Sequence, residues 1–295
     1  MSESTTDFST IGLLGFGTMG AGIAHVLASS GRKVIVLDTD QVRLEAGSAS
    51  VTAFLDGGIA RGTVTDEDKT AVLARIITTT HVGDLAGVDA VIESVTENAE
   101  VKTALLRKVA TVVGEQIPLL TNTSALSVTE LAAALPNPAR VAGLHFFNPA
   151  PVQRTVEVVP ALQTDGDLIE RLVALVDTLA EKVAVVVKDV PGFLVTSLLL
   201  PYLNDVIAEY DDGLATAEDI DVALELGLGY KIGPLKMLDT IGLDVHLHAS
   251  EAAYTATSDS RYAPPPLLRR MVAAGRLGDK NGHGFRTGQP TEENN

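Results

Sequence analysis

The stretch that decides the fold is residues 11–24, IGLLGFGTMGAGIA. Its first four residues are an apolar run typical of a short buried strand, and the glycines that follow lead into a helical stretch over residues 19–29. A second β-rich run, residues 33–37, comes directly after that helix. The order strand, helix, strand predicts a βαβ unit with parallel strands.

Gly15, Gly17 and Gly20 form the pattern G-x-G-x-x-G at the end of the first strand. The first glycine permits a tight turn, the second lets the backbone approach a pyrophosphate, and the third lets the helix pack close to the strand. Unpaired backbone amides at the start of the helix, around Thr18 and Met19, then face the phosphates. The pattern by itself also fits a tight turn without a ligand.

Asp38 favours a dinucleotide site over a simple turn. It ends the second strand, near the offset of roughly 20 residues at which a ribose-binding acid is expected. A carboxylate there accepts hydrogen bonds from the adenosine ribose hydroxyls and repels a 2′-phosphate. The sequence therefore predicts NAD as the cofactor, in preference to NADP.

Further strand candidates alternate with Ala- and Leu-rich helical stretches, including one over residues 128–135. They cover residues 75–78, 89–92, 118–121, 141–144, 155–158 and 183–187. This alternation predicts an α/β fold of the Rossmann type, a doubly wound and mostly parallel sheet covered by helices. The long stretch 41–74 has helical spacing with breaks at 57–58 and 61–63, which predicts an inserted helical hairpin.

The texture of the chain changes after residue 188. Strand-like runs end at a turn, residues 189–192, and Leu- and Ala-rich amphipathic segments follow. We expect two domains, an NAD-binding domain over 1–188 and an all-α domain over 189–295. The helices expected in the second domain cover residues 191–210, 216–226, 234–255 and 265–275.

Composition limits the class of partner. The 295 residues are 46% hydrophobic and 20% charged, as in an ordinary globular protein, and the net charge of −16 repels nucleic acid and anionic lipid. There is no cysteine, which excludes thiolate nucleophiles and Cys-ligated metals, and no metal site is predicted. No apolar run approaches the roughly 18 residues of a membrane span, so we expect a cytoplasmic protein with no nucleic-acid or membrane partner.

His145 stands out in the stretch 143–151, GLHFFNPAP. It follows the strand 141–144, and the carboxyl edge of a doubly wound sheet is where ligands bind. Glu157 interrupts an apolar strand, where a carboxylate is costly unless it is paired, so it is the best candidate to fix one nitrogen of the imidazole. The alternatives are a core histidine and a carboxylate that faces solvent on alternate strand positions.

The stretch 121–124, Thr-Asn-Thr-Ser, ends another strand and offers hydroxyls at the same edge of the sheet. The ordinary alternative for these residues is an N-cap of the helix 128–135. Ser127 can take that capping role, which leaves Ser124 free to bind a ligand.

These motifs together resemble the L-3-hydroxyacyl-CoA dehydrogenase family, of the short 3-hydroxybutyryl-CoA dehydrogenase type, over nearly the whole length. The stretches that carry the resemblance are IGLLGFGTMGAGIA, VIESVTENAEVK, LLTNTSALS, GLHFFNPAPV, VEVV, KDVPGFLV, GPLKMLDTIGLD, YAPPPLLRRMV and GRLGDKNGHGF. Their joint order along the chain is highly specific.

The resemblance implies roles for individual residues. It makes His145 the catalytic base and Glu157 its orienting partner, places Ser124 on the substrate oxygen, and puts Asn148 beside the nicotinamide. It also assigns three residues to the neighbourhood of the cofactor, namely Glu97, Lys102 and Lys280. Their ordinary alternatives are a solvated acid at a helix start, a surface lysine and a lysine in the tail.

The same resemblance implies that the helical domain forms much of a homodimer interface and that the hairpin after Asp38 contacts the CoA moiety. The sequence departs from the family pattern at two points. Thr196 stands where the family usually has an asparagine that helps to bind substrate, and a hydroxyl lacks the reach and second donor of an amide. Near the end, Gly284-Phe285-Arg286 replaces the usual G-F-Y, a change that we expect to concern packing.

The function expected is NAD-dependent oxidation of an L-3-hydroxyacyl-CoA, with 3-hydroxybutyryl-CoA as the first choice, or the reverse reduction. The alternatives keep the chemistry but change the substrate to a hydroxyacyl group on an acyl carrier protein, or to a sugar acid. A nucleotide-binding protein without catalysis is a third class, and the presence of Ser124, His145 and Glu157 argues against it.

Overall fold

The computed structural model describes residues 8–286. The chain divides into two compact units, with the division between Phe193 and Leu194. The boundary predicted from the sequence, after residue 188, lies slightly earlier. Among the described residues no helix is both long and apolar enough to cross a membrane. The cytoplasmic location stays a prediction.

The first unit is built on one eight-stranded sheet with the order β3-β2-β1-β4-β5-β6-β7-β8. The chain order reverses between β1 and β4, which is the switch point where a doubly wound sheet binds its ligand. All neighbouring pairs are parallel except β6 and β7. This confirms the predicted mostly parallel, Rossmann-type sheet. The strands are β1 Thr10–Leu14, β2 Lys33–Leu37, β3 Ile76–Thr79, β4 Ala90–Glu93, β5 Leu119–Thr121, β6 Val141–Phe146, β7 Thr155–Pro160 and β8 Val183–Val186.

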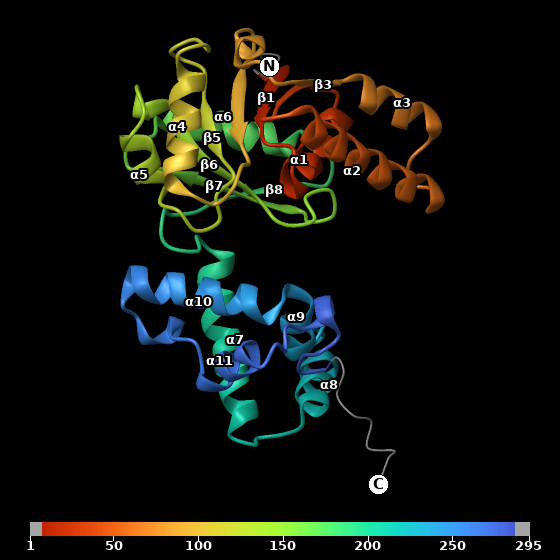
Figure 1. The fold of residues 1–295 in the computed structure, drawn as a ribbon, viewed down its shortest axis with the longest axis vertical. Coiled ribbons are helices and arrows are strands. Elements are labelled where there is room, and N and C mark those ends of the chain that lie inside the picture. Colours follow the sequence, from red (N-terminus) through yellow and green to blue (C-terminus); the bar gives the residue numbers. More distant parts are fainter. Residues whose placement is uncertain (1–7, 287–295) are drawn as a thin grey trace. The chain divides into compact units, whose positions relative to one another are not determined.

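Helices cover both faces of this sheet (Figure 1). Alternate strand residues point to opposite faces, so Leu13 joins one apolar core and Leu14 the other. The first core packs the sheet against α1 Thr18–Ser29, α2 Gln41–Ala60, α3 Asp66–Ala74 and α6 Gly166–Asp177. The second packs it against η1 Val82–Leu85, α4 Ala99–Ala110 and α5 Val128–Ala133; the short η2 spans Pro138–Arg140.

The predicted helical hairpin is present as α2 and α3, which extend from the edge of the sheet in Figure 1. Helix α2 continues through Gly57 and Gly58, so the break predicted there is wrong and the turn lies at residues 61–65. Helix α3 begins with a capping box, in which Thr65 and Asp68 satisfy each other's backbone amides.

The second unit is helical within the described residues, as predicted. It contains α7 Val195–Asp211, α8 Ala217–Leu228, α9 Pro234–Ile241, α10 Leu243–Thr257, η3 Ser260–Tyr262, α11 Pro266–Ala273 and η4 Asp279–Asn281. The single helix predicted over 234–255 is wrong. Gly242 has φ +98°, a value that an α-helix does not allow, and it separates α9 from α10.

Candidate active site

The glycine turn between β1 and α1 has the geometry that the pattern predicted. Gly15 has φ +91°, and a Cβ there would lie 2.6 Å from the carbonyl oxygen of Ser94. A Cβ on Gly20 would lie 2.1 Å from the carbonyl oxygen of Gly15. A Cβ on Gly17, in contrast, would meet nothing within 4 Å. Two glycines are therefore required by the turn itself, whereas the third leaves open space above the start of α1.

The start of α1 fits the phosphates of a dinucleotide. Gly17 is the N-cap and has no side chain to satisfy the amides of the first turn, and no acidic residue lies in that turn, which begins with Thr18 and Met19. The amides and the positive end of the helix dipole therefore face open space, an arrangement that binds anions.

Asp38 stands at the end of β2, beside the same turn. One carboxylate oxygen accepts a hydrogen bond from the backbone amide of Phe16 at 2.7 Å, and the other accepts from the amide of Thr39 at 2.6 Å. The oxygen that binds the Thr39 amide also accepts from the Thr39 hydroxyl at 3.2 Å, so the lone pair left for a ribose hydroxyl is on the oxygen that binds Phe16. The turn, the helix start and this acid together fit NAD.

His145 and Glu157 form a buried pair across β6 and β7. They lie directly opposite each other in the antiparallel register, and Nδ1 of His145 is 2.7 Å from Oε2 of Glu157. Glu157 is fully buried and His145 is 6% exposed. Because a carboxylate only accepts hydrogen bonds, Nδ1 carries the proton and Nε2 keeps its lone pair. The pair therefore has the arrangement of a base and its orienting group.

The strand that carries His145 is longer than predicted. The sequence placed its end at residue 144, but pairing with β7 extends β6 through Phe146. The imidazole points to the face covered by α4 and α5, because its neighbours Leu144 and Phe146 belong to the core on the other face. Phe147 and Phe193 pack on the ring, with centroids 4.5 and 5.6 Å from it. These contacts hold the imidazole in one orientation.

Ser124 follows β5, the neighbour of β6. Ser127 caps α5 by accepting a hydrogen bond from the amide of Glu130, which confirms the capping role predicted for it. The Ser124 hydroxyl is exposed and makes no hydrogen bond to any described residue, so it is available to a ligand. The side-chain oxygen of Asn122 accepts from the amide of Phe146 at 2.8 Å and ties the ends of β5 and β6 together.

Lys102 is buried, so the alternative of a surface lysine is wrong. Its side chain is 1% exposed, and the ammonium lies 2.7 Å from Oε1 of Glu93 and 3.1 Å from Oε2 of Glu97. It also donates to the carbonyl oxygen of Val95. The ammonium is thus held among three oxygens at the carboxyl end of β4. Glu93 was missed from the sequence, although a carboxylate in an apolar strand is the signal that identified Glu157.

Glu97 links this network to the loop that carries Ser124. Its Oε1 accepts hydrogen bonds from the Thr123 hydroxyl and from the amides of Ser124 and Ala125. Burial opposes the charge of Glu97, but Lys102 and the hydrogen bond from Thr123 outweigh that effect and lower its pKa. The carboxylate is therefore charged at neutral pH and fixes the backbone of the serine loop.

The remaining predicted site residues belong to none of the hydrogen-bonded pairs and networks described above. Asn148 is exposed in the loop between β6 and β7. Thr196 and Lys280 belong to the second unit, where Thr196 is the second residue of α7 and the Lys280 ammonium pairs with Asp244. Arg286, the departure from G-F-Y, pairs with Asp221 in the same unit at 3.3 Å. The packing role expected for this change stays a prediction.

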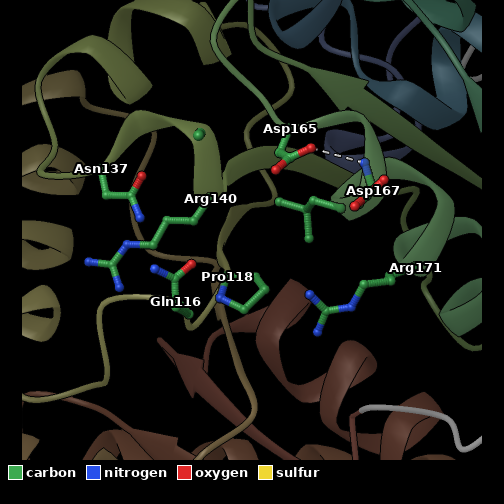
Figure 2. A pocket seen from close by; sticks show the side chains of 9 residues that line it. Gln116, Pro118, Asn137, Arg140, Asp165, Asp167 and Arg171 are labelled. Carbon is green, nitrogen blue, oxygen red and sulfur yellow. Dashed lines mark hydrogen bonds between the residues drawn. The ribbon is translucent and has the colours of Figure 1, made fainter.

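A pocket of about 360 Å³ lies at the opposite, amino edge of the sheet (Figure 2). Pro118 and Arg140, which directly precede β5 and β6, line it together with the start of α6. The Arg140 guanidinium donates to the carbonyl oxygens of Gly114 and Ile117, and Asp165 caps α6. These side chains serve the fold, and none of the predicted site residues lines this pocket.

Comparison with known proteins agrees with this arrangement. Residues 10–190 match the family model described as 3-hydroxyacyl-CoA dehydrogenase, NAD binding domain, and residues 192–288 match the 3-hydroxyacyl-CoA dehydrogenase C-terminal domain. A 3-hydroxybutyryl-CoA dehydrogenase of Bradyrhizobium diazoefficiens is 38% identical over 93% of this chain and 94% of its own length.

Two further similarities bear on the substrate. A 3-hydroxyadipyl-CoA dehydrogenase of Escherichia coli is 40% identical over 93% of this chain and 58% of its own length. The crystal structure of (S)-3-hydroxybutyryl-CoA dehydrogenase from Ralstonia eutropha superposes with a TM-score of 0.91 at 40% identity, covering 95% of this chain and 99% of that one.

Proposed function

The chain belongs to the 3-hydroxyacyl-CoA dehydrogenase family and its cofactor is NAD, and from this premise we propose that it interconverts L-3-hydroxybutyryl-CoA and the 3-oxoacyl-CoA through a His145–Glu157 proton relay. The observation that carries the proposal is the buried pair with Nδ1 and Oε2 at 2.7 Å, at the same carboxyl edge of the NAD-binding sheet as the glycine turn.

The relay works by holding one proton and moving another. Glu157 keeps the Nδ1 proton of His145 in place, so Nε2 accepts the proton of the substrate 3-hydroxyl as its O–H bond breaks. NAD, when bound, supplies the acceptor for the hydride that leaves C3. In the reverse direction the His145 imidazolium returns the proton to the oxygen, and buried Glu157 stabilises that positive charge.

Ser124 and Asn148 have positioning roles in this proposal. The free hydroxyl of Ser124 donates a hydrogen bond to the substrate oxygen, and Glu97 holds the loop that presents it. The Asn148 amide binds beside the nicotinamide. Lys102 holds Glu97 by an ion pair and so has a structural role near the cofactor, and Lys280 keeps the role near the cofactor that the resemblance implies.

The choice of acyl group rests on the named relatives. Relatives are named for 3-hydroxybutyryl-CoA and for 3-hydroxyadipyl-CoA, and Thr196 replaces the substrate-binding asparagine expected of the family. We place 3-hydroxybutyryl-CoA first because similarity to enzymes with that name covers nearly the full length of both chains.

A substrate panel tests the proposal. NADH formation is measured with 3-hydroxybutyryl-CoA, 3-hydroxyadipyl-CoA, a 3-hydroxybutyryl group on an acyl carrier protein, and free hydroxy acids including a sugar acid. We expect the highest kcat/KM with 3-hydroxybutyryl-CoA. A higher kcat/KM with the carrier-bound group or a free acid would identify that compound as the substrate in place of 3-hydroxybutyryl-CoA. NAD binding without turnover of any of these compounds would contradict a catalytic function.

The Thr196→Asn variant belongs in the same panel. We expect it to change KM for the acyl thioesters, since it restores an amide with a second donor, and to leave the NADH dissociation constant unchanged. An unchanged KM for every thioester would mean that Thr196 does not contact the substrate.

A homodimer is part of the proposal. Large apolar side chains of the second unit are exposed, among them Leu198 at 66%, Leu226 at 83% and Leu228 at 64%. Exposed apolar side chains also occur on the first unit, for example Leu162 at 91%, so the choice of the helical unit as the interface follows the family resemblance. Sedimentation equilibrium should give twice the monomer mass, and a monomer at micromolar concentration would contradict this part.

A further inference from the structure

Lys182 is a buried cation that the proposed mechanism does not use. It directly precedes β8, whose first residue pairs with Thr155 at the start of β7. Because β7 runs antiparallel to β6, this is the edge of the sheet at which β6 ends. Lys182 is only 7% exposed, and burial lowers its pKa.

The Lys182 ammonium donates hydrogen bonds to a single loop. Among the described residues it forms no ion pair. It donates to the backbone carbonyl oxygens of Ala150 at 2.8 Å, Pro151 at 3.3 Å and Gln153 at 2.7 Å. All three belong to the loop 147–154 between β6 and β7. An ammonium has three protons, so its donors are all used on this loop.

The other side of the loop packs on α1. A Cβ on Gly22 would lie 3.1 Å from Cβ of Ala150 and 3.2 Å from Cδ of Pro151, so the absence of a side chain lets the loop approach the helix. Lys182 also acts electrostatically on His25, one turn further along α1, whose pKa is lowered by burial and then by this ammonium. The loop is therefore held between Lys182 and the helix that carries the glycine turn.

The same loop carries the groups that surround the reaction centre. Phe147, its first residue, packs on the His145 ring at 4.5 Å, and Asn148 follows it. Burying the Lys182 ammonium costs desolvation energy. Hydrogen bonds to three backbone carbonyl groups, and not an ion pair with a carboxylate, offset that cost. Loss of these bonds would free the backbone at residues 150–153 and, through it, Phe147 and Asn148.

We propose that Lys182 is a positioning residue for the nicotinamide end of NAD: its ammonium fixes the loop 147–154 against α1, so that Asn148 and Phe147 keep their places beside His145. The inference rests on the proposed function for the role of Asn148. Lys182 itself touches no group that reacts, because its donors face the loop backbone.

The test compares two ligands that share the adenosine half of NAD. NADH and ADP-ribose are titrated into the wild type and Lys182→Met by calorimetry. We expect about tenfold weaker NADH binding in the variant, the effect of losing one or two hydrogen bonds, with ADP-ribose affinity unchanged because the glycine turn and Asp38 are intact. The kcat should also fall, whereas KM for the acyl thioester should stay unchanged.

Two further variants keep the comparison decisive. Lys182→Arg retains the charge but presents a planar fork, so NADH affinity should fall about threefold, again with ADP-ribose unchanged; this variant decides the matter if Lys182→Met does not fold. Lys108→Met, at an exposed lysine on α4, should bind both ligands like the wild type. Equal losses for the two ligands in the Lys182 variants, or no loss for either, would overturn the proposal.

These titrations contain no acyl substrate. A selective loss of NADH affinity therefore supports the role of Lys182 even if the substrate panel returns no turnover. Conversely, turnover of 3-hydroxybutyryl-CoA with equal ligand affinities in Lys182→Met would leave the proposed function standing and remove only this inference.

Discussion

Glu157 and Glu93 are both fully buried carboxylates, but their partners give them different chemistry. Glu93 faces the ammonium of Lys102 and the hydroxyl of Thr121. Glu157 faces an imidazole, which has a second nitrogen that can accept a proton. In the proposed relay, Glu157 therefore holds one tautomer of the ring before the reaction and stabilises the imidazolium during it.

We expect Glu157→Gln to lower kcat by about 10- to 100-fold. The amide can still accept a hydrogen bond from Nδ1, but it cannot stabilise the imidazolium that forms when Nε2 takes the proton. NADH affinity should be unchanged, because β4, β5 and β6 lie between the glycine turn after β1 and Glu157 on β7. The control is Glu130→Gln, a carboxylate on α5. A kcat within twofold of the wild type would show that the orienting charge is dispensable.

A functional residue can be predicted from the sequence when its side chain conflicts with the apolar pattern around it. Glu157 was identified because it is charged within an apolar strand, and the structure places it opposite His145. Glu93 has the same signal, but the strand was predicted to end one residue earlier. Lys182 gives no such signal, because a lysine before a strand is ordinary and its partners are backbone carbonyls.

The glycine turn shows how one element separates folding from binding. Gly15 and Gly20 are required by contacts within the turn, at 2.6 and 2.1 Å from carbonyl oxygens. Gly17 has extended backbone angles, φ −70° and ψ −166°, that any residue adopts, and open space around its missing side chain. Its glycine is therefore explained by the approach of a ligand and not by the fold.

Gly17→Ala should therefore weaken both NADH and ADP-ribose binding by at least about tenfold and change the free energy of unfolding by less than about 0.5 kcal/mol. Gly20→Ala should instead lower that free energy by about 1–3 kcal/mol, because its Cβ meets the backbone. Gly166→Ala, in open space at the far edge of the sheet, is the control for ligand binding. Normal NADH and ADP-ribose affinity in Gly17→Ala would show that the pyrophosphate does not bind close to Gly17.

Strands and helices with a regular spacing of apolar residues were predicted correctly. The residues at which these elements end were predicted less well. The eight strands and the hairpin are present, since apolar runs and helical spacing are local signals. The end of β6 depends on pairing with β7, which a single strand does not reveal. The break at Gly242 was missed because one glycine inside a helical pattern is often tolerated, and only its φ of +98° shows the interruption.

Both units of the chain bury polar side chains. In the first unit, the pairs Lys102–Glu93 and His145–Glu157 lie at the carboxyl edge of the sheet. In the second, His246 on α10 is 2% exposed, with Nε2 at 3.0 Å from the side-chain oxygen of Asn204 on α7. Ser250 donates to that same oxygen. These neutral partners stabilise a neutral imidazole, and burial lowers the pKa of His246 from 6.5 to about 4.

The second unit should therefore lose stability in acid. Because the folded-state pKa of His246 lies below its unfolded value, the unfolded chain binds a proton that the folded chain does not. The stabilisation is full above pH 6.5 and falls as the pH drops from 6.5 towards about 4, by up to about 3 kcal/mol. Hydrogen exchange of the α10 amides, measured at pH 7 and pH 5 and corrected for intrinsic rates, reports this loss.

His246→Gln should reduce that pH dependence, and His248→Gln, at an exposed position on the same helix, should retain it. If the wild type and His246→Gln lost α10 protection equally on acidification, other groups would be responsible.

The proton relay is tested most directly by His145→Gln, with NADH formation from 3-hydroxybutyryl-CoA and NADH affinity measured on the same preparation. We expect a kcat at least about 100-fold below the wild type, since the variant lacks the proposed base Nε2, and an unchanged NADH dissociation constant, since the glycine turn and Asp38 remain. A kcat close to that of the wild type would contradict the proposed relay.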